Sequence, residues 1–391
     1  MTSTIHDVAL VGGGPAGLLA ALLAARAGAR TAVVAPPAPA DARTTALLDG
    51  SVAMLQEAGL WAELAPHAAP LKSLRIADAC RRLFRAPEAI FHASELGLEA
   101  FGWNIANARL TEALATALAE TPGVTLVERP ATASRPDENG IEIDLAEGGA
   151  VSARLAVAAD GRRSLMREAA GVRLRSRRAR QTALAFTVAH ERDHGFVSTE
   201  LHFEEGPFTL VPLPGRRSSV VWAVRPERAE TLAALPLETL GDAAAEASGR
   251  LLGAMTVEGR VGRFPIEIGA AAPLAARRTL LVGEAAHVLP PIGAQGLNLG
   301  FRDAASAAKA IGRAVAEGRD PGGDATLRSY MRARSADVWS RTAATDMLNR
   351  SLLTDFAPFH AARSLGLAAV SRIGPLRRFM MREGLAGGPA V

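Results

Sequence analysis

The beginning of the chain has a glycine pattern that restricts the fold more than any other feature. Residues 7–11 (DVALV) indicate a short buried strand, which runs into Gly12, Gly14 and Gly17 in the spacing Gly-x-Gly-x-x-Gly. A helix to about residue 27 and a second strand (TAVV) complete a βαβ unit. The first glycine permits a tight turn, the second lets a diphosphate touch the backbone, and the third lets helix and strand pack closely. The pattern predicts a Rossmann-like domain with a dinucleotide at the positive end of the helix.

The second strand lacks the acidic residue that usually follows it. In such domains an Asp or Glu about 20 residues after the glycine turn binds the ribose hydroxyls. Here the strand runs into Ala35-Pro36-Pro37, and we interpret the later Asp41 as a turn residue. The ribose must therefore be held by other groups, or less tightly. Arg43 lies just beyond and is either a ligand of the diphosphate or a solvated loop arginine.

Two later turns also follow apolar strands. In AVAADGRRSLMR a strand delivers Asp160 to a glycine turn, although this pattern is also ordinary strand–turn–helix punctuation. In LLVGEAAHVLPPIGAQGLNLGFRDA, Glu284 leaves a strand, and a turn containing Gly293 and Gly296 precedes an expected helix. A turn without large side chains lets an anionic or flat group approach the main chain. The positive helix end then stabilises negative charge on a flat ring.

The middle of the chain changes from α/β to β character. Residues 183–225 alternate in the manner of strands (ALAFTVAH, TELHF, FTLVPL, SSVVWAVR), and turn residues separate these segments. This indicates an antiparallel meander that forms a second domain inserted in the first. α/β character returns around the Glu284 turn, and the residues after about 320 are helical and rich in arginine.

Composition excludes several function classes. Cys80 is the only cysteine, so the chain has no internal disulfide, no cysteine metal site and no redox pair of cysteines. The formal net charge is +4 and the pI about 10.1. Only Lys72 and Lys309 among the 44 basic residues are lysines, so few groups titrate between neutral pH and arginine. The high pI therefore does not indicate a nucleic-acid partner.

The composition also indicates in which cellular compartment the protein is expected. One cysteine fits a reducing cytoplasm. The first residues lack the features of a signal peptide, and no apolar run reaches about 18 residues. We expect a cytoplasmic protein, and contact with the inner face of the membrane stays open.

The three motifs, in this order and with an inserted β domain, resemble the class A flavoprotein aromatic hydroxylases, which have the para-hydroxybenzoate hydroxylase fold. The family pattern is GxGxxG, then a DG motif, then a GD motif, matched here from Gly12, at Asp160-Gly161 and at Gly283-Glu284. Within this group the chain is most similar to the ubiquinone-biosynthesis hydroxylases. DARTTALLDGSVAMLQEAGLW, GPFTLVPLPGRRSSVVWAV and GEAAHVLPPIGAQGLNLGFRD carry this similarity, which extends from about residue 5 to residue 350.

The resemblance implies an α/β fold with FAD as cofactor. Residues 1–73, 101–180 and 269–350 would form a Rossmann-like FAD-binding domain, residues 74–100 and 181–268 the inserted antiparallel β-sheet substrate domain, and residues 351–391 a helical C-terminal segment. Carried over by position, the residues that would contact FAD are Gly12, Gly14, Ala16, Gly17, Arg43, Asn107, Asp160, Glu284, Gly293, Gly296, Leu297 and Asn298. Glu284 departs from the family pattern, where Asp is usual, and its extra methylene must be accommodated.

The resemblance also implies the chemistry. Reduced flavin would react with O2 to give a C4a-hydroperoxide, which hydroxylates the ring of a polyprenylated phenol in ubiquinone biosynthesis. NAD(P)H or a protein electron donor would reduce the flavin. The lipid-tailed phenol would bind between the β meander and the flavin, with Phe208, Leu210, Pro212 and Trp222 as candidates for its pocket, each of which is otherwise ordinary core.

No residue stands out as the base that deprotonates the phenol. His287, in GEAAH, is one candidate, and the alternative is a histidine packed near the loop. His202, between Leu201 and Phe203 on a strand, is the other, and it faces either the substrate or solvent.

Partners and rival functions stay open. The C-terminal stretch LLTDFAPFHAARSLGLAAVSRIGPLRRFMMREG is basic and amphipathic, which suits a peripheral membrane contact, a partner helix or a cover for the FAD domain. The protein would act as a homo-oligomer or within a quinone-biosynthesis complex. The alternatives to a hydroxylase are a non-catalytic FAD-bearing subunit of such an assembly and a flavin reductase that acts on a prenyl lipid.

Overall fold

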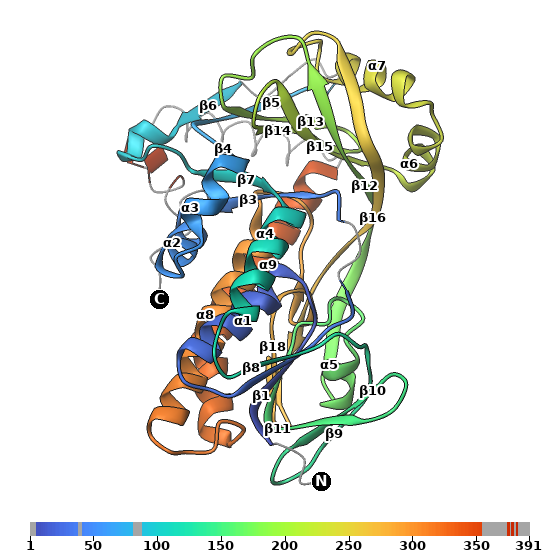
Figure 1. Cartoon of the computed structure of the whole chain (residues 1–391). Coiled ribbons are helices and arrows are strands. Elements are labelled where there is room, and N and C mark those ends of the chain that lie inside the picture. Colours follow the sequence, from blue (N-terminus) through green and yellow to red (C-terminus); the bar gives the residue numbers. More distant parts are fainter. Residues whose placement is uncertain are drawn as a thin grey trace.

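Three β-sheets and a layer of helices make up the part of the chain that the computed structural model describes, which is residues 5–37, 41–80, 88–353, 374–375, 377–378 and 381. One sheet and most helices form the lower half of the molecule in Figure 1, and a second sheet forms the upper half. The third sheet has only three strands and lies between them.

The lower sheet is the Rossmann-like one. Its parallel strands follow the order β18-β11-β1-β2-β8. Antiparallel β17 pairs with β18, and antiparallel β10, which pairs in turn with β9, is attached to β11. The strands are β1 (His6–Val11), β2 (Thr31–Val34), β8 (Val124–Val127), β9 (Ala131–Pro136), β10 (Ile141–Leu145), β11 (Ala150–Ala158), β17 (Ala275–Ala276) and β18 (Thr279–Leu281). The last residues of β1 (8–11) and of β11 (155–158) are apolar and buried, because both faces of a parallel sheet are covered.

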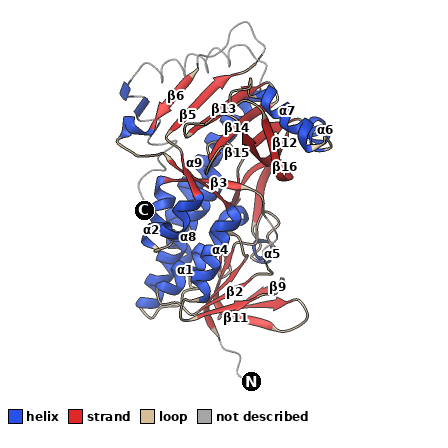
Figure 2. Cartoon of the chain, turned by 45° about the horizontal axis from the view of Figure 1, so that its top comes forward, coloured by secondary structure: helices blue, strands red, loops and turns tan. Residues whose placement is uncertain are grey.

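Helices far apart in the sequence pack side by side against this sheet (Figure 2). α1 (Pro15–Arg26) joins β1 to β2, and α4 (Asn107–Ala119) and α8 (Gln295–Ala316) flank it. α9 (Asp324–Leu353) packs beside α8 and extends upward to β14 of the inserted sheet. α1 consists largely of Ala and Leu, which is typical of a helix that is enclosed by its neighbours. The shorter helices are α2 (Asp49–Glu57), α3 (Trp61–Leu64) and α5 (Leu165–Ala169).

The upper sheet is the inserted domain. Its strand order is β19-β16-β12-β15-β14-β13-β5-β6, and every neighbouring pair is antiparallel except β13 with β5. The strands are β5 (Ser73–Asp78), β6 (Ala89–His92), β12 (Arg173–His190), β13 (Val197–Phe203), β14 (Gly206–Leu213), β15 (Arg217–Val224), β16 (Met255–Ala272) and β19 (His287–Val288). β12 and β16 are each 18 residues long and connect the two halves as a paired ribbon (Figure 1).

The inserted sheet has two faces with different neighbours. On the outer face, α6 (Pro226–Ala233) and α7 (Leu237–Ala247) cover a core that includes Phe186 and Val220. The inner face meets the three-stranded sheet of β3 (Thr44–Leu48), β7 (Gly102–Ala106) and β4 (Ala68–Pro70), which the sequence analysis did not predict. The side-chain amide of Asn104 on β7 donates to the Pro212 carbonyl at 2.9 Å and to Ser219 Oγ at 3.3 Å.

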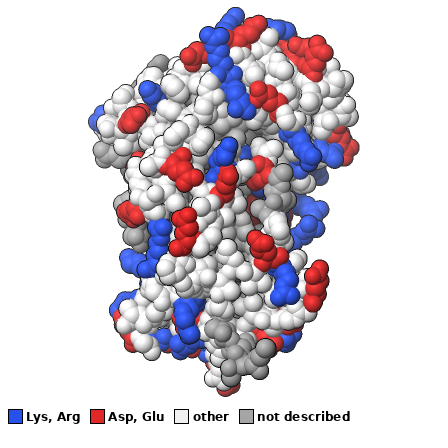
Figure 3. Space-filling model, viewed as in Figure 1, with Lys and Arg blue, Asp and Glu red and all other residues white. Residues whose placement is uncertain are grey.

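On the face shown in Figure 3, acidic and basic side chains are interspersed. None of the helices in the described ranges is long and apolar enough to cross a membrane. Most of residues 351–391 lie outside the described residues, but Arg377 pairs with Glu95 and stacks over Phe91, and Met381 is buried in the same cluster. These described C-terminal residues therefore pack on the inserted domain.

Candidate functional site

The sequence motifs meet at one edge of the parallel sheet. Gly12 follows β1, Asp160 follows β11 and Gly283 follows β18, and these three strands are parallel neighbours. The carboxyl ends of neighbouring parallel strands lie side by side, and open α/β sheets bind ligands in the crevice outside these ends. The N-terminal ends of α1 and α8 point to the same edge (Figure 1).

The glycine turn has the geometry that a diphosphate requires. Gly12 has φ +125°, and a Cβ built on it would lie 2.1 Å from the Ala159 carbonyl oxygen. A Cβ on Gly17 would lie 2.8 Å from the Gly12 carbonyl oxygen, so helix and strand need both glycines. Gly14 is different, because among the described residues, its chain neighbours aside, no atom would lie within 4 Å of a Cβ there. The turn is thus tightly packed at its base and open at its tip, beside the first-turn amides of Ala16 and Gly17.

Arg43 and Asn107 are held together by Asp41. Arg43 donates to both oxygens of Asp41 at 2.8 Å, and the Asn107 side-chain amide donates to Asp41 Oδ2 at 3.0 Å. Burial raises the pKa of Asp41, but these hydrogen bonds outweigh burial, so the net pKa is lowered and the carboxylate stays charged. Asp41, interpreted from the sequence as a turn residue, therefore positions both predicted FAD contacts.

The turn before α8 places bare main chain at the same edge. Gly293 has φ +63° and Ala294 φ +54°. Apart from the adjacent backbone of α8, no atom of the part of the chain that the structure describes would lie within 4 Å of a Cβ on Gly296. Asn298 is buried and ties this turn to β3: its Oδ1 accepts from the Leu48 amide at 2.9 Å, and its Nδ2 donates to the Ala46 carbonyl at 2.8 Å. Leu297 is partly buried and packs on the main core. Asn298 therefore fixes the turn rather than reaching outward.

Glu284 and Asp160 have different roles in the structure. The Glu284 side chain is 52% exposed, lies 3.9 Å from Arg162, and its charge contributes to raising the pKa of Arg43 after the larger effect of Asp41. Asp160 accepts hydrogen bonds from the Ser164 hydroxyl and, at 3.1 Å, from the Met166 amide, so it caps the start of α5. Burial raises the pKa of Asp160.

His287 lies in a buried ionic network behind the site. Its Nε2 is 2.7 Å from Asp303 Oδ2, and the Arg334 Nε donates to Asp303 Oδ1 at 2.8 Å. All three side chains are at most 1% exposed. Asp303 also accepts from the Gly283 amide at 3.0 Å. The His287 imidazole therefore belongs to the network that holds the Glu284 turn. It is buried, away from any surface that a phenol could reach.

The candidate substrate residues divide between the two faces of the inserted sheet. Phe208, Leu210 and Trp222 are at most 3% exposed and belong to the core beneath α6 and α7. Pro212 is buried on the same side, because strand side chains alternate and it is two residues from Leu210. These residues therefore form a covered core and not a surface that faces the Rossmann-like domain, and their assignment to the substrate pocket stays a prediction.

The other predicted histidine lies on the opposite face. In the strand register, Ser219 pairs with Val211, Val221 with Thr209, and Thr209 with Glu200. Residues that pair or lie two apart share a face, so Glu200 and His202 share the inner face with Ser219, which contacts β7. His202 Nε2 lies 2.7 Å from Glu200 Oε1, and both side chains are 13% exposed.

These residues fit FAD. Its diphosphate needs an open tip beside helix amides, which Gly14 provides, and its flat ring needs uncovered main chain, which Gly296 provides. Arg43 supplies the positive charge. Together with the inserted β-sheet, the site defines the class of two-domain FAD-dependent flavoproteins.

Comparisons with known proteins agree with this class. The chain belongs to the FAD-binding domain family, whose sequence model matches residues 6–345, and this is a family of FAD-dependent monooxygenases. The chain is 36% identical over 390 residues to ubiquinone hydroxylase UbiL from Rhodospirillum rubrum, covering 97% of this chain and 90% of that protein. It is 29% identical to the 3-demethoxyubiquinol 3-hydroxylase of Escherichia coli, covering 98% and 100%.

Solved structures show the same fold. p-Nitrophenol 4-monooxygenase PnpA from Pseudomonas putida superposes with a TM-score of 0.81, at 20% identity and with 100% of both chains covered. The expected α/β fold with an inserted β-sheet domain is thereby confirmed. The match to the FAD-binding domain family confirms FAD as cofactor.

Three important residues were not predicted. The sequence pattern assigns Asp41 to a turn, and it gives no role to Asp303 or Arg334. Asp303 had a usable signal, because it is a charged residue among the apolar positions of α8. Arg334 had none, since α9 carries many arginines and only the packing shows which one is buried.

Proposed function

We propose that this protein is an FAD-dependent monooxygenase that hydroxylates the aromatic ring of a polyprenylated phenol in ubiquinone biosynthesis. The proposal rests on one observation: the space around Gly14 and the space around Gly296 are both open, and both lie at the same edge of the parallel sheet, below the inserted β-sheet. The similarity to a protein named ubiquinone hydroxylase and to one named 3-demethoxyubiquinol 3-hydroxylase supports the substrate class. When bound, FAD would supply the activation of O2.

The protein's own groups would bind and orient the cofactor. The amides of Gly14, Ala16 and Gly17 would hold the diphosphate, with Arg43 beside it. The amides at the start of α8 would lie against the ring, where the positive helix end favours its reduced, anionic form. Glu284 is exposed at this edge and would reach a hydroxyl-bearing part of the cofactor. NAD(P)H or a protein donor would supply the electrons.

The inner face of the inserted sheet would receive the phenol. Thr209, Val211 and Val221 lie on this face and are each only partly buried, unlike the fully buried residues of the outer face. We infer that they line the ring pocket in place of Phe208, Leu210 and Trp222. Mixed apolar and hydroxyl groups suit a ring that carries polar substituents.

His202 is the residue that we propose as the proton acceptor for the phenol. Glu200 accepts the hydrogen on His202 Nε2, which leaves Nδ1 as the acceptor. A carboxylate in this position fixes the tautomer and the orientation of the imidazole. His202→Gln should lower kcat while leaving FAD binding unchanged, and raising the pH should recover part of kcat, because the phenol then ionises in solution. Equal kcat–pH profiles for wild type and His202→Gln would exclude this role.

One experiment tests the function as a whole. The purified full chain is loaded with FAD, and NADH or NADPH oxidation and O2 consumption are followed with and without a short-chain prenylphenol. A hydroxylated product with stimulated O2 consumption supports the proposal. Bound FAD without stimulated turnover favours a non-catalytic FAD-bearing subunit, and reduction of the prenyl chain without O2 uptake favours a lipid reductase. A preparation that binds no FAD contradicts all three.

The setting of the reaction is also a proposal. A lipid-tailed substrate resides in a membrane, so the enzyme would work at the inner face of the membrane, as a homo-oligomer or within a quinone-biosynthesis complex. Co-sedimentation with membranes and analytical ultracentrifugation test these two points directly.

A further inference from the structure

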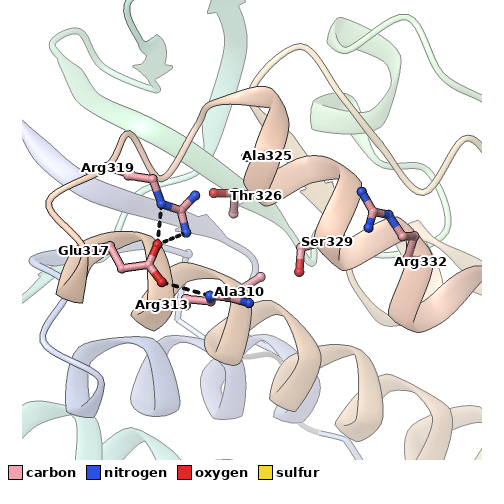
Figure 4. Close-up of a pocket in the computed structure, with 8 residues that line it drawn as sticks. All are labelled: Ala310, Arg313, Glu317, Arg319, Ala325, Thr326, Ser329 and Arg332. Carbon is pink, nitrogen blue, oxygen red and sulfur yellow. Dashed lines mark hydrogen bonds and ion pairs between the residues drawn. The ribbon is translucent and has the colours of Figure 1, made fainter.

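A pocket that is separate from the proposed FAD site lies at the opposite end of α8. Its volume is about 340 Å³, and it is formed where α8 ends and α9 begins (Figure 4). The 22 residues of α8 separate it from the Gly293 turn by about 33 Å, at 1.5 Å per residue. The lining residues are Ala310, Arg313, Glu317, Arg319, Ala325, Thr326, Ser329 and Arg332.

The pocket carries excess positive charge. Arg313 donates to Glu317 at 2.9 Å and Arg319 donates to the same carboxylate at 2.6 Å, so two guanidinium groups share one negative charge. Arg332 forms no ion pair within the part of the chain that the structure describes. Three arginines and one glutamate leave a net charge of +2 around the opening.

A buried hydroxyl group in the pocket wall has no partner. Thr326 is 2% exposed, and its Oγ1 makes no hydrogen bond to any described residue. In Figure 4 its side chain points to the side of the pocket where Arg319 lies. A buried hydroxyl without a partner costs about 1–3 kcal/mol, so such groups usually serve a ligand. Ser329 contributes a second hydroxyl from the same helix.

We propose that this pocket binds the phosphate group of a phosphorylated ligand. Arginine forks match the paired oxygens of phosphate, and a hydroxyl donor and the first turn of α9 add further hydrogen bonds to the same group. The excess of arginine over carboxylate excludes a cation, and the charged lining excludes a purely apolar ligand. The phosphate would belong either to an anionic lipid headgroup or to a soluble phosphorylated compound. This site is separate from the proposed FAD chemistry and does not depend on it.

The variants separate the pocket from general charge. Arg319→Gln/Arg332→Gln removes two pocket arginines, and Thr326→Val removes only the hydroxyl while keeping the side-chain shape. Arg328→Gln is the matched control, because Arg328 is on the same helix, is 56% exposed and does not line the pocket. All proteins are studied as the full chain saturated with FAD, so that phosphate does not compete for the diphosphate turn.

The first measurement is binding of inorganic phosphate by calorimetry and by its effect on Tm at constant ionic strength. The second is co-flotation with vesicles of phosphatidylcholine, with or without phosphatidylglycerol. We expect the double variant to lose at least tenfold in affinity and Thr326→Val at least threefold, while Arg328→Gln changes less than twofold. Binding of free phosphate identifies a soluble ligand, and pocket-dependent binding of anionic vesicles alone identifies a headgroup.

Two results would overturn the proposal. In one, wild type binds neither probe. In the other, Arg328→Gln weakens binding as much as the double variant does, which would show attraction to a charged surface without a pocket. Because Thr326→Val removes an unsatisfied group, it should fold at least as stably as wild type, so its loss of binding cannot come from unfolding.

Discussion

Replacing Asp303 by Asn should destabilise the protein by about 3–5 kcal/mol. Asp303 is fully buried and accepts hydrogen bonds from Gly283, His287 and Arg334, and the Arg334 side chain is 1% exposed. Removing the charge deprives the buried guanidinium of its fully buried partner and leaves it only the partly exposed Asp337, 2.8 Å from Arg334 Nη1. Breaking a buried ion pair costs about 3–5 kcal/mol in other proteins. Single domains are typically stable by about 5–15 kcal/mol, so the loss is a large part of the total. Because Asp303 also fixes the Gly283 turn next to Glu284, FAD affinity should fall as well.

Urea unfolding of the apoprotein measures the stability, and fluorescence titration measures FAD binding. Asp324→Asn is the control, because Asp324 is 86% exposed on α9 and should change stability by less than about 0.5 kcal/mol. Asp303→Asn/Arg334→Met removes both charges and should recover at least about 1 kcal/mol relative to Asp303→Asn alone. If Asp303→Asn unfolds within about 1 kcal/mol of wild type, the network is not a major source of stability and the reasoning fails.

Three further predictions follow from the geometry. Gly14→Ala should leave urea stability within about 0.5 kcal/mol but weaken FAD binding at least tenfold in a titration, whereas Gly12→Ala should lose about 3 kcal/mol or more, because its Cβ meets the Ala159 carbonyl. Trp222→Ala should lose about 3–5 kcal/mol in urea unfolding without changing the KM of the folded enzyme for a prenylphenol, and a large rise in KM would return Trp222 to the substrate pocket. Burial raises the pKa of Asp337, but hydrogen bonds and charges from Arg341 and nearby arginines outweigh burial and lower it to about 2. Its stabilisation, about 2 kcal/mol, is therefore present above pH 4 and lost as the pH falls towards 2, and Asp337→Asn should flatten this part of the stability–pH curve unless the carboxylate contributes nothing.

The sequence alone determined the parts of the protein that depend on short-range geometry. A Gly-x-Gly-x-x-Gly turn works through contacts within one βαβ unit, so its role was readable from residues 7–34 and the structure bears out the tight packing at Gly12. The alternating pattern of residues 183–225 similarly predicted strands, because alternation is a property of each strand by itself. The order of the motifs was enough to indicate the family.

The tertiary structure alone decided which side chains are available to act. Alternation separates the two faces of β14 but does not say which is covered, and here α6 and α7 cover the side that carries Phe208 and Leu210. His287, Asp303 and Arg334 come from three elements, so their ionic network exists only once these elements pack. Burial and charge pairing depend on neighbours distant in the chain. This is why a histidine in a strong motif became a support, while the strand face that carries Glu200 and His202 came to be the inner face.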